Sequence, residues 1–277
     1  MNASGAAVLP PAVLPPAVLP PAVLPPAVLP PAVHPEEQQV ARALMRAAVY
    51  RLLGGAWAYP TPSHLEDLAA LAESVAVDSP LAPVFAAFAS AARGADAEAT
   101  AQEYVFLFDR EARCPPYEGA WGDAPQMAGK SALLADIAGF YAAFGLEPSA
   151  VHPDAEDHIA PECEFMSALC LKEAYALAEG MTEGLEVTGR AQASFLGEHL
   201  GRWAETFAGA VKEATPLPYY GVLADLLIAW VREEIAGVGA DPQRVVGRFG
   251  YDPVQEEAFT CPMAPASLQE DPQDETA

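Results

Sequence analysis

The sequence predicts an all-α protein, a bundle of about eight to nine helices. Apolar residues recur at the helical spacing of 3.6 residues in successive segments, and no alternating strand pattern of useful length is found. Glycine and proline separate these segments, and serine or aspartate precedes several of them, as is typical of helix ends.

The first predicted helix starts at Glu36, where Val40, Leu44 and Leu52 form an apolar stripe, and it ends near Gly54. The next helices are expected at about 63–77, 80–93 and 96–108, with Ser63, Ser79 and Asp96 as their N-caps.

A loop rich in proline and glycine is expected at 109–125, followed by a helix that runs to Phe144 and ends on Gly145. Residues 146–156 form a second predicted loop. The remaining helices are expected at about 157–180, 186–214 and 217–237, with a short one near 241–248.

Both ends of the chain differ from its body. Residues 7–31 are five copies of AVLPP, whose paired prolines prevent helix and sheet pairing and favour extended polyproline II. The tail is rich in proline and acidic residues. We therefore expect a disordered arm at 1–35, an all-helical domain at 36–251, divisible into sub-lobes 36–145 and 146–251, and a disordered tail at 252–277.

The charge balance restricts the partners. There are 38 acidic and 14 basic residues, so the net charge of −24 repels nucleic acids and anionic membranes and favours a cationic partner. The four cysteines do not suggest a disulfide framework in a chain of this length, and no apolar run is long enough to span a membrane. No Lys or Arg precedes Arg42, whereas a signal peptide begins with a positively charged region. These features predict a soluble cytoplasmic protein.

The segment AEDHIAPECEFMSALC, residues 155–170, carries the residue types that bind metals and move protons. Asp157 is placed to cap the predicted helix, at whose exposed start His158 lies, and Pro161 suits its first turn. The apolar positions of this helix share one face, which we expect in the core: Ile159, Cys163, Met166 and Cys170.

A metal-dependent hydrolase is one interpretation of this segment. His158 and Glu162 are four residues apart on one helix face, but a metal needs a third ligand, and the nearest candidates, His152 and Cys114, lie in loops. No HExxH motif, second metal-binding pair or nucleophile elbow is present. We therefore expect the purified protein to carry no stoichiometric metal.

The aromatic residues of EYVFLF, residues 103–108, have two interpretations. Tyr104, Leu107 and Phe108 face one way, and Tyr117 and Trp121 follow in the loop. Such a cluster packs a core, or it lines a groove for a segment that is both basic and apolar.

Several motifs resemble one known family. YVFLFDREARCPPYEG, from Tyr104, and EDHIAPECEFMSAL, from Glu156, are similar to two signature segments of the TorD/DmsD/NarJ group of redox enzyme maturation chaperones. FLGEHLGRWAETF, with His199, Leu200 and Trp203, and PLPYYGVLADLLIAWV resemble the C-terminal helices of that group. The resemblance covers about residues 40–237 in the family's order. It departs from the family pattern at Glu156, where proline is frequent, and at Cys163, where leucine is usual.

The resemblance implies a non-catalytic chaperone that binds the catalytic subunit of a molybdenum oxidoreductase of the DMSO reductase family, often through its twin-arginine signal peptide. It implies help with insertion of the molybdopterin cofactor before export, no stoichiometric cofactor in the chaperone, and a monomer or homodimer. A hydrolase using His158 and Glu162, and an adaptor acting through the AVLPP arm, remain the alternatives. The implied client-binding residues, together with the aromatic pair before the loop, are Tyr104, Phe108, Pro116, Tyr117, Glu118, Asp157, His158, Glu162 and Glu164.

Overall fold

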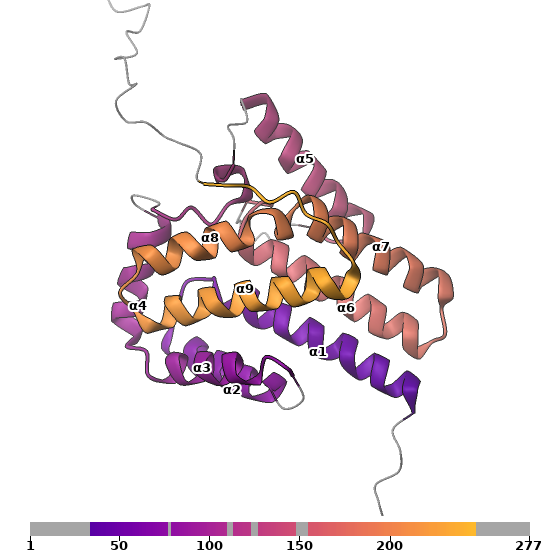
Figure 1. Ribbon diagram of the computed structural model, residues 1–277, viewed down its shortest axis with the longest axis horizontal. Coiled ribbons are helices and arrows are strands. Elements are labelled where there is room, and N and C mark those ends of the chain that lie inside the picture. Colours follow the sequence, from indigo (N-terminus) through magenta and orange to yellow (C-terminus); the bar gives the residue numbers. More distant parts are fainter. Residues whose placement is uncertain (1–33, 77–78, 110–112, 123–126, 148–154, 248–277) are drawn as a thin grey trace, which may run out of the picture. The chain divides into compact units, whose positions relative to one another are not determined.

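The computed structural model describes residues 34–76, 79–109, 113–122, 127–147 and 155–247. Within these ranges the chain is helical and has no β-strand, so the all-α prediction is confirmed (Figure 1). All the described elements belong to one compact unit that begins at Pro35. The α-helices are α1 (Pro35–Ala56), α2 (Pro62–Ala76), α3 (Ala82–Arg93), α4 (Ala97–Tyr104), α5 (Met127–Ala143), α6 (Ile159–Ala178), α7 (Thr182–Glu198), α8 (Leu200–Ala214) and α9 (Pro218–Val238).

Helix α1 packs along α6. The Ser167 hydroxyl donates to the Ala47 carbonyl at 2.9 Å, and Gly54 lets the backbones approach, since a Cβ there would lie 3.3 Å from the Ala160 oxygen. The predicted core face of α6 is confirmed, because Ile159, Cys163, Met166 and Cys170 are fully buried. Helix α2 packs on α3, and α9 packs on both α3 and α8.

The cysteine prediction is confirmed for the three described cysteines, Cys114, Cys163 and Cys170, which are free thiols. None of the helices in the described ranges is both long and apolar enough to cross a membrane. The predicted arm, apart from His34 and Pro35, and the predicted tail lie outside the described residues. The division into sub-lobes stays a prediction.

The predicted helix 186–214 is wrong, because α7 ends at Glu198 and α8 begins at Leu200. His199 between them has φ −129° and ψ −101°, which is not helical. The turn is so tight that a Cβ at Gly201 would lie 2.2 Å from the Leu196 carbonyl oxygen. The short helix predicted near 241–248 is also wrong, since residues 240–247 are not helical.

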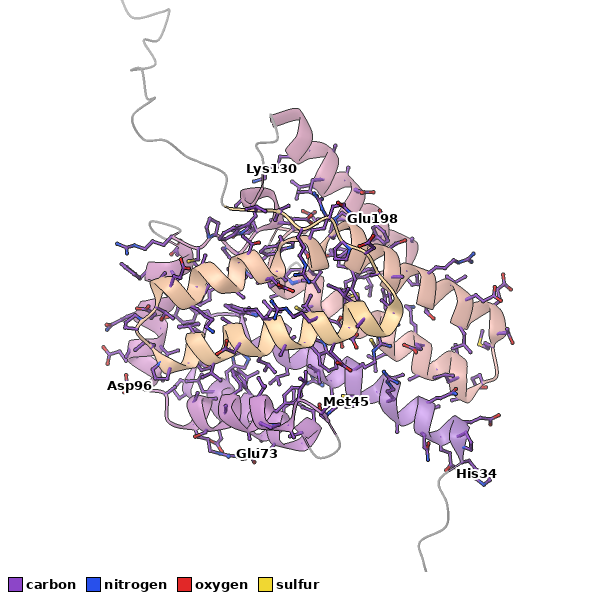
Figure 2. The ribbon with its side chains drawn as sticks, in the orientation of Figure 1. His34, Met45, Glu73, Asp96, Lys130 and Glu198 are labelled. Atoms are coloured by element: carbon purple, nitrogen blue, oxygen red, sulfur yellow. The ribbon has the colours of Figure 1, made fainter. Side chains whose placement is uncertain are left out.

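The predicted caps have different outcomes. Asp96 lies at the start of α4 (Figure 2), where its side chain accepts a hydrogen bond from the Ala99 N–H at 2.7 Å and caps the helix as predicted. Gly145 adopts the left-handed conformation (φ 72°) just after α5, as expected of a helix end. Ser63 is not an N-cap, because it lies inside α2. The Ser79 hydroxyl accepts from the Leu81 N–H and stabilises the turn before α3, not the helix.

The predicted helix 96–108 continues from α4 into a π-helix, Val105–Asp109. This segment buries Leu107 and Phe108, and the Phe108 ring packs edge-on against Trp57 and Tyr220. Trp121 is also buried. The core interpretation of the aromatic cluster therefore holds for Leu107, Phe108 and Trp121.

Candidate functional site

The loop before α5 pairs with the start of α6. The Glu118 N–H donates to the Asp157 carbonyl at 2.8 Å, and the Ile159 N–H donates to the Pro116 carbonyl at 2.9 Å. These two bonds form an isolated antiparallel bridge. The bridge joins the Pro-Tyr-Glu and Asp-His motifs, which are about forty residues apart in the sequence.

The prediction that Asp157 caps α6 is wrong. The N-cap is His158, whose Nδ1 accepts from the Ala160 N–H at 3.1 Å. The Asp157 Oδ2 instead accepts from the Gly119 N–H at 3.1 Å, and a Cβ at Gly119 would lie only 3.0 Å from that oxygen. Burial raises the pKa of Asp157, while the Gly119 N–H and the charge of Lys130 act in the opposite direction.

The expected exposure of His158 is also wrong. His158 is 2% exposed and Asp157 is 0% exposed, because the paired loop covers the start of α6. The half-buried Tyr117 ring packs edge-on against the His158 ring, with 5.2 Å between centroids. The buried side chains of the Asp-His motif therefore hold the loop and the start of α6 together.

Glu162 is a buried carboxyl group one turn further along α6. Its Oε2 accepts from the Trp203 indole N–H at 3.1 Å, and its Oε1 has no hydrogen-bond partner among the described residues. Burial raises the pKa of Glu162 well above its ordinary value, and the nearby charge of Glu118 raises it further. The Trp203 N–H favours the charged form but does not outweigh burial.

Glu118 connects this buried cluster to α8. Its Oε2 lies 3.1 Å from His199 Nδ1, and its Oε1 lies 3.7 Å from Arg202 Nη1. His199 Nε2 lies 3.5 Å from the Oδ2 of Asp136 on α5. Sequence reasoning noted His199 as part of a helical motif but missed it, and Arg202, as partners of Glu118. The only signal was the His-Leu-x-x-Trp element, which gives no indication of what it contacts.

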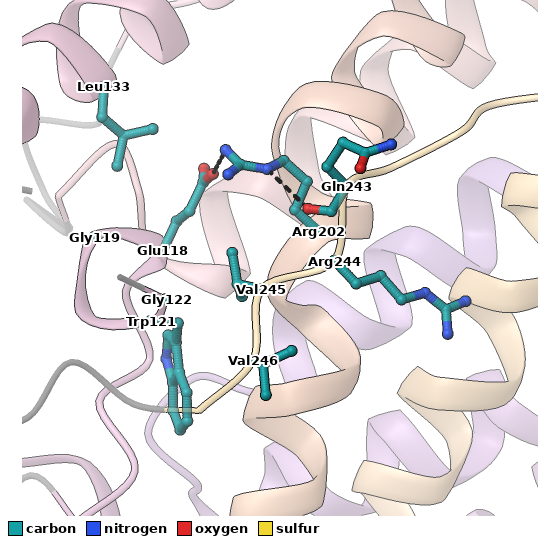
Figure 3. Close-up of a pocket in the computed structure, with 10 residues that line it drawn as sticks. All are labelled: Glu118, Gly119, Trp121, Gly122, Leu133, Arg202, Gln243, Arg244, Val245 and Val246. Carbon is teal, nitrogen blue, oxygen red and sulfur yellow. Dashed lines mark hydrogen bonds and ion pairs between the residues drawn. The ribbon is translucent and has the colours of Figure 1, made fainter. Parts of the chain in front are cut away.

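A cavity of about 500 Å³ lies beside Glu118 (Figure 3). Its wall comes from the paired loop, α5, α8 and the segment after α9. Glu118 and Arg202 point toward each other across part of it. The lining residues are Glu118, Gly119, Trp121, Gly122, Leu133, Arg202, Gln243, Arg244, Val245 and Val246.

The structure brings together six of the nine predicted site residues, Pro116, Tyr117, Glu118, Asp157, His158 and Glu162. Of the nine, only Glu118 lines the cavity. Tyr104 is half-buried against Phe108, with ring centroids 5.1 Å apart, and Glu164 is exposed on α6. The binding role of all nine stays a prediction.

Metal-binding residues do not cluster in the described part of the chain. No group of three or more His, Cys, Asp or Glu side chains is placed there to hold an ion. Of the two candidate third ligands, Cys114 is buried and His152 lies outside the described residues.

Asp157→Ala is expected to lower the free energy of unfolding by about 1–3 kcal/mol, because it leaves the Gly119 N–H without its acceptor in the loop. Asp157→Asn keeps an acceptor oxygen at this position and is expected to cost clearly less. Urea denaturation of the two variants measures the difference. Equal losses in both would show that the bond to Gly119 does not hold the loop.

The fold and the site define an all-α protein in which a buried polar cluster fixes a loop at the edge of a cavity, an arrangement suited to binding. Residues 74–209 match the family model described as the nitrate reductase delta subunit. The chain is 31% identical over 126 residues to the perchlorate reductase assembly chaperone protein of Dechloromonas aromatica, covering 45% of this chain and 55% of that protein. These sequence matches agree with the resemblance to the TorD-like redox enzyme maturation chaperones.

Further relatives are similar over comparable lengths. The selenate reductase assembly chaperone protein of Thauera selenatis is 32% identical, with 42% of this chain and 59% of that protein covered. The chaperone protein TorD of Aeromonas salmonicida is 30% identical, with 47% and 56% covered. The chain thus matches less than two thirds of the length of these relatives. A crystal structure from Archaeoglobus fulgidus, described as a redox enzyme maturation protein, is 21% identical with a TM-score of 0.42, covering 68% of this chain and 92% of that one.

Proposed function

We propose that this protein is an assembly chaperone for the catalytic subunit of a molybdopterin-containing oxidoreductase. One observation carries the proposal: relatives at about 30% identity are named as assembly chaperones of perchlorate and selenate reductases. The family model also spans both paired motifs, at 116–118 and 157–159. Because the matches cover about half of this chain, the activity of the whole protein is inferred from its relatives and not from its own site.

The finer part of the proposal is that the chaperone binds the twin-arginine signal peptide of its client in the cytoplasm. It holds the client until the molybdopterin cofactor has been inserted, and it keeps no cofactor itself. The net charge of −24 favours such a cationic segment. Exposed ion pairs contribute only about 0.2–1 kcal/mol each, whereas micromolar binding needs about −8 kcal/mol. Apolar contacts therefore supply most of the affinity, and carboxylates supply selectivity.

The alternatives gain no support from the described residues. His158 Nδ1 accepts the Ala160 N–H, and Glu162 Oε2 accepts the Trp203 N–H, so each atom is already engaged with a structural partner. The hydrolase would need both as metal ligands or catalysts. The adaptor interpretation concerns an arm outside the described residues.

The direct test is fluorescence anisotropy with a labelled synthetic leader that carries an Arg-Arg pair followed by an apolar run. We expect saturable binding that weakens but persists as salt rises, since apolar contacts are insensitive to screening. A leader with Lys-Lys, and a scrambled leader, should bind much more weakly. Equal binding of all three peptides would overturn the signal-peptide part of the proposal.

Glu164→Gln is expected to weaken binding of the Arg-Arg leader by up to roughly five-fold, the upper value of an exposed ion pair. Glu164 is the one exposed residue among the nine predicted, and glutamine keeps its size and hydrogen-bonding atoms, so urea denaturation of the variant accompanies the binding measurement. Glu179→Gln removes the same charge from an exposed site at the other end of α6 and serves as the control. The same loss in both variants would mean that only net charge matters.

A further inference from the structure

The segment after α9 crosses α8 in an extended conformation. The chain reverses at Gly239, which has the left-handed φ of 69° that ends α9, and residues 240–247 run back over α8 (Figure 1). We call residues 243–247 the strap. In the strap, the Val245 N–H donates to the Arg202 carbonyl at 3.0 Å, and the Val245 carbonyl accepts from the Thr206 hydroxyl at 2.8 Å.

The far end of the strap reaches the paired loop. The Gly122 N–H donates to the Gly247 carbonyl at 3.1 Å. A Cβ at Gly122 would lie 3.0 Å from Val245 Cγ1, so only glycine allows Val245 to lie this close. Gly122 also has φ 92°, a conformation that favours glycine. The groove between α8 and the loop is therefore shaped for an extended chain with an apolar side chain at this point.

A carboxylate receives the basic residue of the strap. Arg244 Nη2 lies 2.8 Å from Glu205 Oε1, and the Glu205 side chain is only 16% exposed. Glu205 also accepts two hydrogen bonds from Arg232, which lower its pKa and keep it charged. The groove thus binds an arginine followed by an apolar residue.

The strap is held by features that a different peptide could reproduce. Apart from the contact of the Arg244 side chain with Glu205, its hydrogen bonds in the groove involve its backbone N–H and carbonyl groups, as in strand-addition binding. Few side chains anchor it, and Val246 is 88% exposed. The cavity of about 500 Å³ beside it leaves room for larger side chains than its own.

We propose that the strap occupies the groove into which an extended segment of the client, an arginine followed by apolar residues, docks by displacing it. This inference rests on the proposed function and adds the place of binding. The client arginine takes the position of Arg244 on Glu205, and its apolar residue takes the position of Val245 at Gly122. The client binds only molecules in which the strap has left the groove, which we call the open form. The apparent affinity is therefore the affinity of the open form multiplied by the fraction of molecules that are open.

Two full-length variants set the strap open or closed. Arg244→Ala with Val245→Ala removes the ion pair to Glu205 and the contact with Gly122. Val246→Ala, at the exposed neighbour, is the matched control. Gly122→Cys with Val245→Cys, in a Cys261→Ser background, closes the strap by a disulfide; because a side chain at the φ of 92° is strained, the reduced form of the same variant is its reference. The two Cβ positions are 3.2 Å apart, a few tenths of an ångström below the usual range of about 3.5–4.5 Å.

Two labelled peptides are the probes: one with the sequence ADPQRVVG of residues 240–247, and the Arg-Arg leader. We expect the opened variant to bind both at least about three-fold tighter than wild type, because a larger fraction is open. The Val246→Ala control should bind like wild type. The oxidised double-cysteine variant should bind neither peptide, and reductant should restore binding, which also shows that this variant is folded.

The outcomes separate the two proposals. If the leader binds the oxidised and reduced forms equally, the groove is not the docking site and the inference is overturned, although client recognition stands. If the ADPQRVVG peptide follows the expected pattern and the leader binds no variant, the groove takes extended peptides, but the signal-peptide proposal fails. If neither peptide binds the opened variant, the inference is overturned.

Discussion

Arg46→Ala is expected to lower the free energy of unfolding by about 3–5 kcal/mol, the usual cost of removing one partner from a buried ion pair. Arg46 lies on α1 and is buried. Its Nε and Nη2 donate to the Glu234 carboxylate on α9 at 2.9 and 2.8 Å, and its Nη1 donates to Glu173 on α6 at 2.7 Å. Its Nη2 also donates to Gln192 on α7 at 2.8 Å. One side chain therefore joins four helices.

The charge of Arg46 is maintained by its partners. Burial alone would lower the pKa of Arg46, but the hydrogen bonds and charge of Glu234, with the charge of Glu173, raise it above the ordinary value. Without Arg46, the buried Glu234 keeps a carboxylate with no compensating charge. This desolvated carboxylate, more than the lost contacts, is the source of the expected destabilisation.

Urea denaturation of three variants tests this account. Arg46→Lys keeps the charge but cannot make the bidentate contact with Glu234. We therefore expect it to lower the free energy of unfolding, but by less than Arg46→Ala does. Arg46→Met combined with Glu234→Gln removes both charges and should be less damaging than Arg46→Ala. If the double variant is the least stable of the three, the unpaired carboxylate is not the cause.

The buried ion pair between Arg46 and Glu234 could not be predicted from the sequence. The helix that carries Arg46 follows from its apolar stripe, yet Arg46 and Glu234 are 188 positions apart. The sequence shows neither which buried acid meets this arginine nor that it is buried at all. Local patterns predict an element, whereas a polar contact between elements depends on their packing.

The difference between local patterns and contacts between elements also explains why the burial of the Asp-His motif was not predicted. The residue types and the family resemblance pointed to 116–118 and 157–162, and the structure brings these two segments together, while their binding role stays a prediction. Their burial was not predictable, because it results from the backbone pairing of Glu118 with Asp157. The break between α7 and α8 was missed for a similar reason. In the sequence, Gly201 cannot be distinguished from a glycine inside a helix. Only the structure shows that the Leu196 carbonyl lies against it.

The free energy of unfolding is expected to fall as the pH rises above the ordinary pKa of a glutamic acid, because of Glu162. Burial raises the pKa of Glu162 in the folded protein well above its unfolded value, so between the two values the folded state binds more protons. The contribution of Glu162 to the free energy of unfolding is fully present below the pKa that Glu162 has in the unfolded chain. It is lost as the pH rises through the pKa that Glu162 has in the folded protein. The slope approaches about 1.4 kcal/mol for each pH unit within this window.

Two substitutions isolate this contribution. Glu162→Gln keeps the size and an acceptor for the Trp203 indole but cannot ionise, so the difference in stability between wild type and variant should change with pH in favour of the variant as the pH rises. Trp203→Phe removes the hydrogen bond that favours the charged form, so it should widen the window and make the loss at alkaline pH larger. Urea denaturation at several pH values between 5 and 9, roughly the range above the ordinary carboxyl pKa, gives the comparison.

A constant difference between wild type and Glu162→Gln over that range would mean that the Glu162 carboxyl titrates normally despite its burial. In that case water must reach its unpartnered Oε1, and the cluster beneath the loop is more open than the packing of Trp203 indicates.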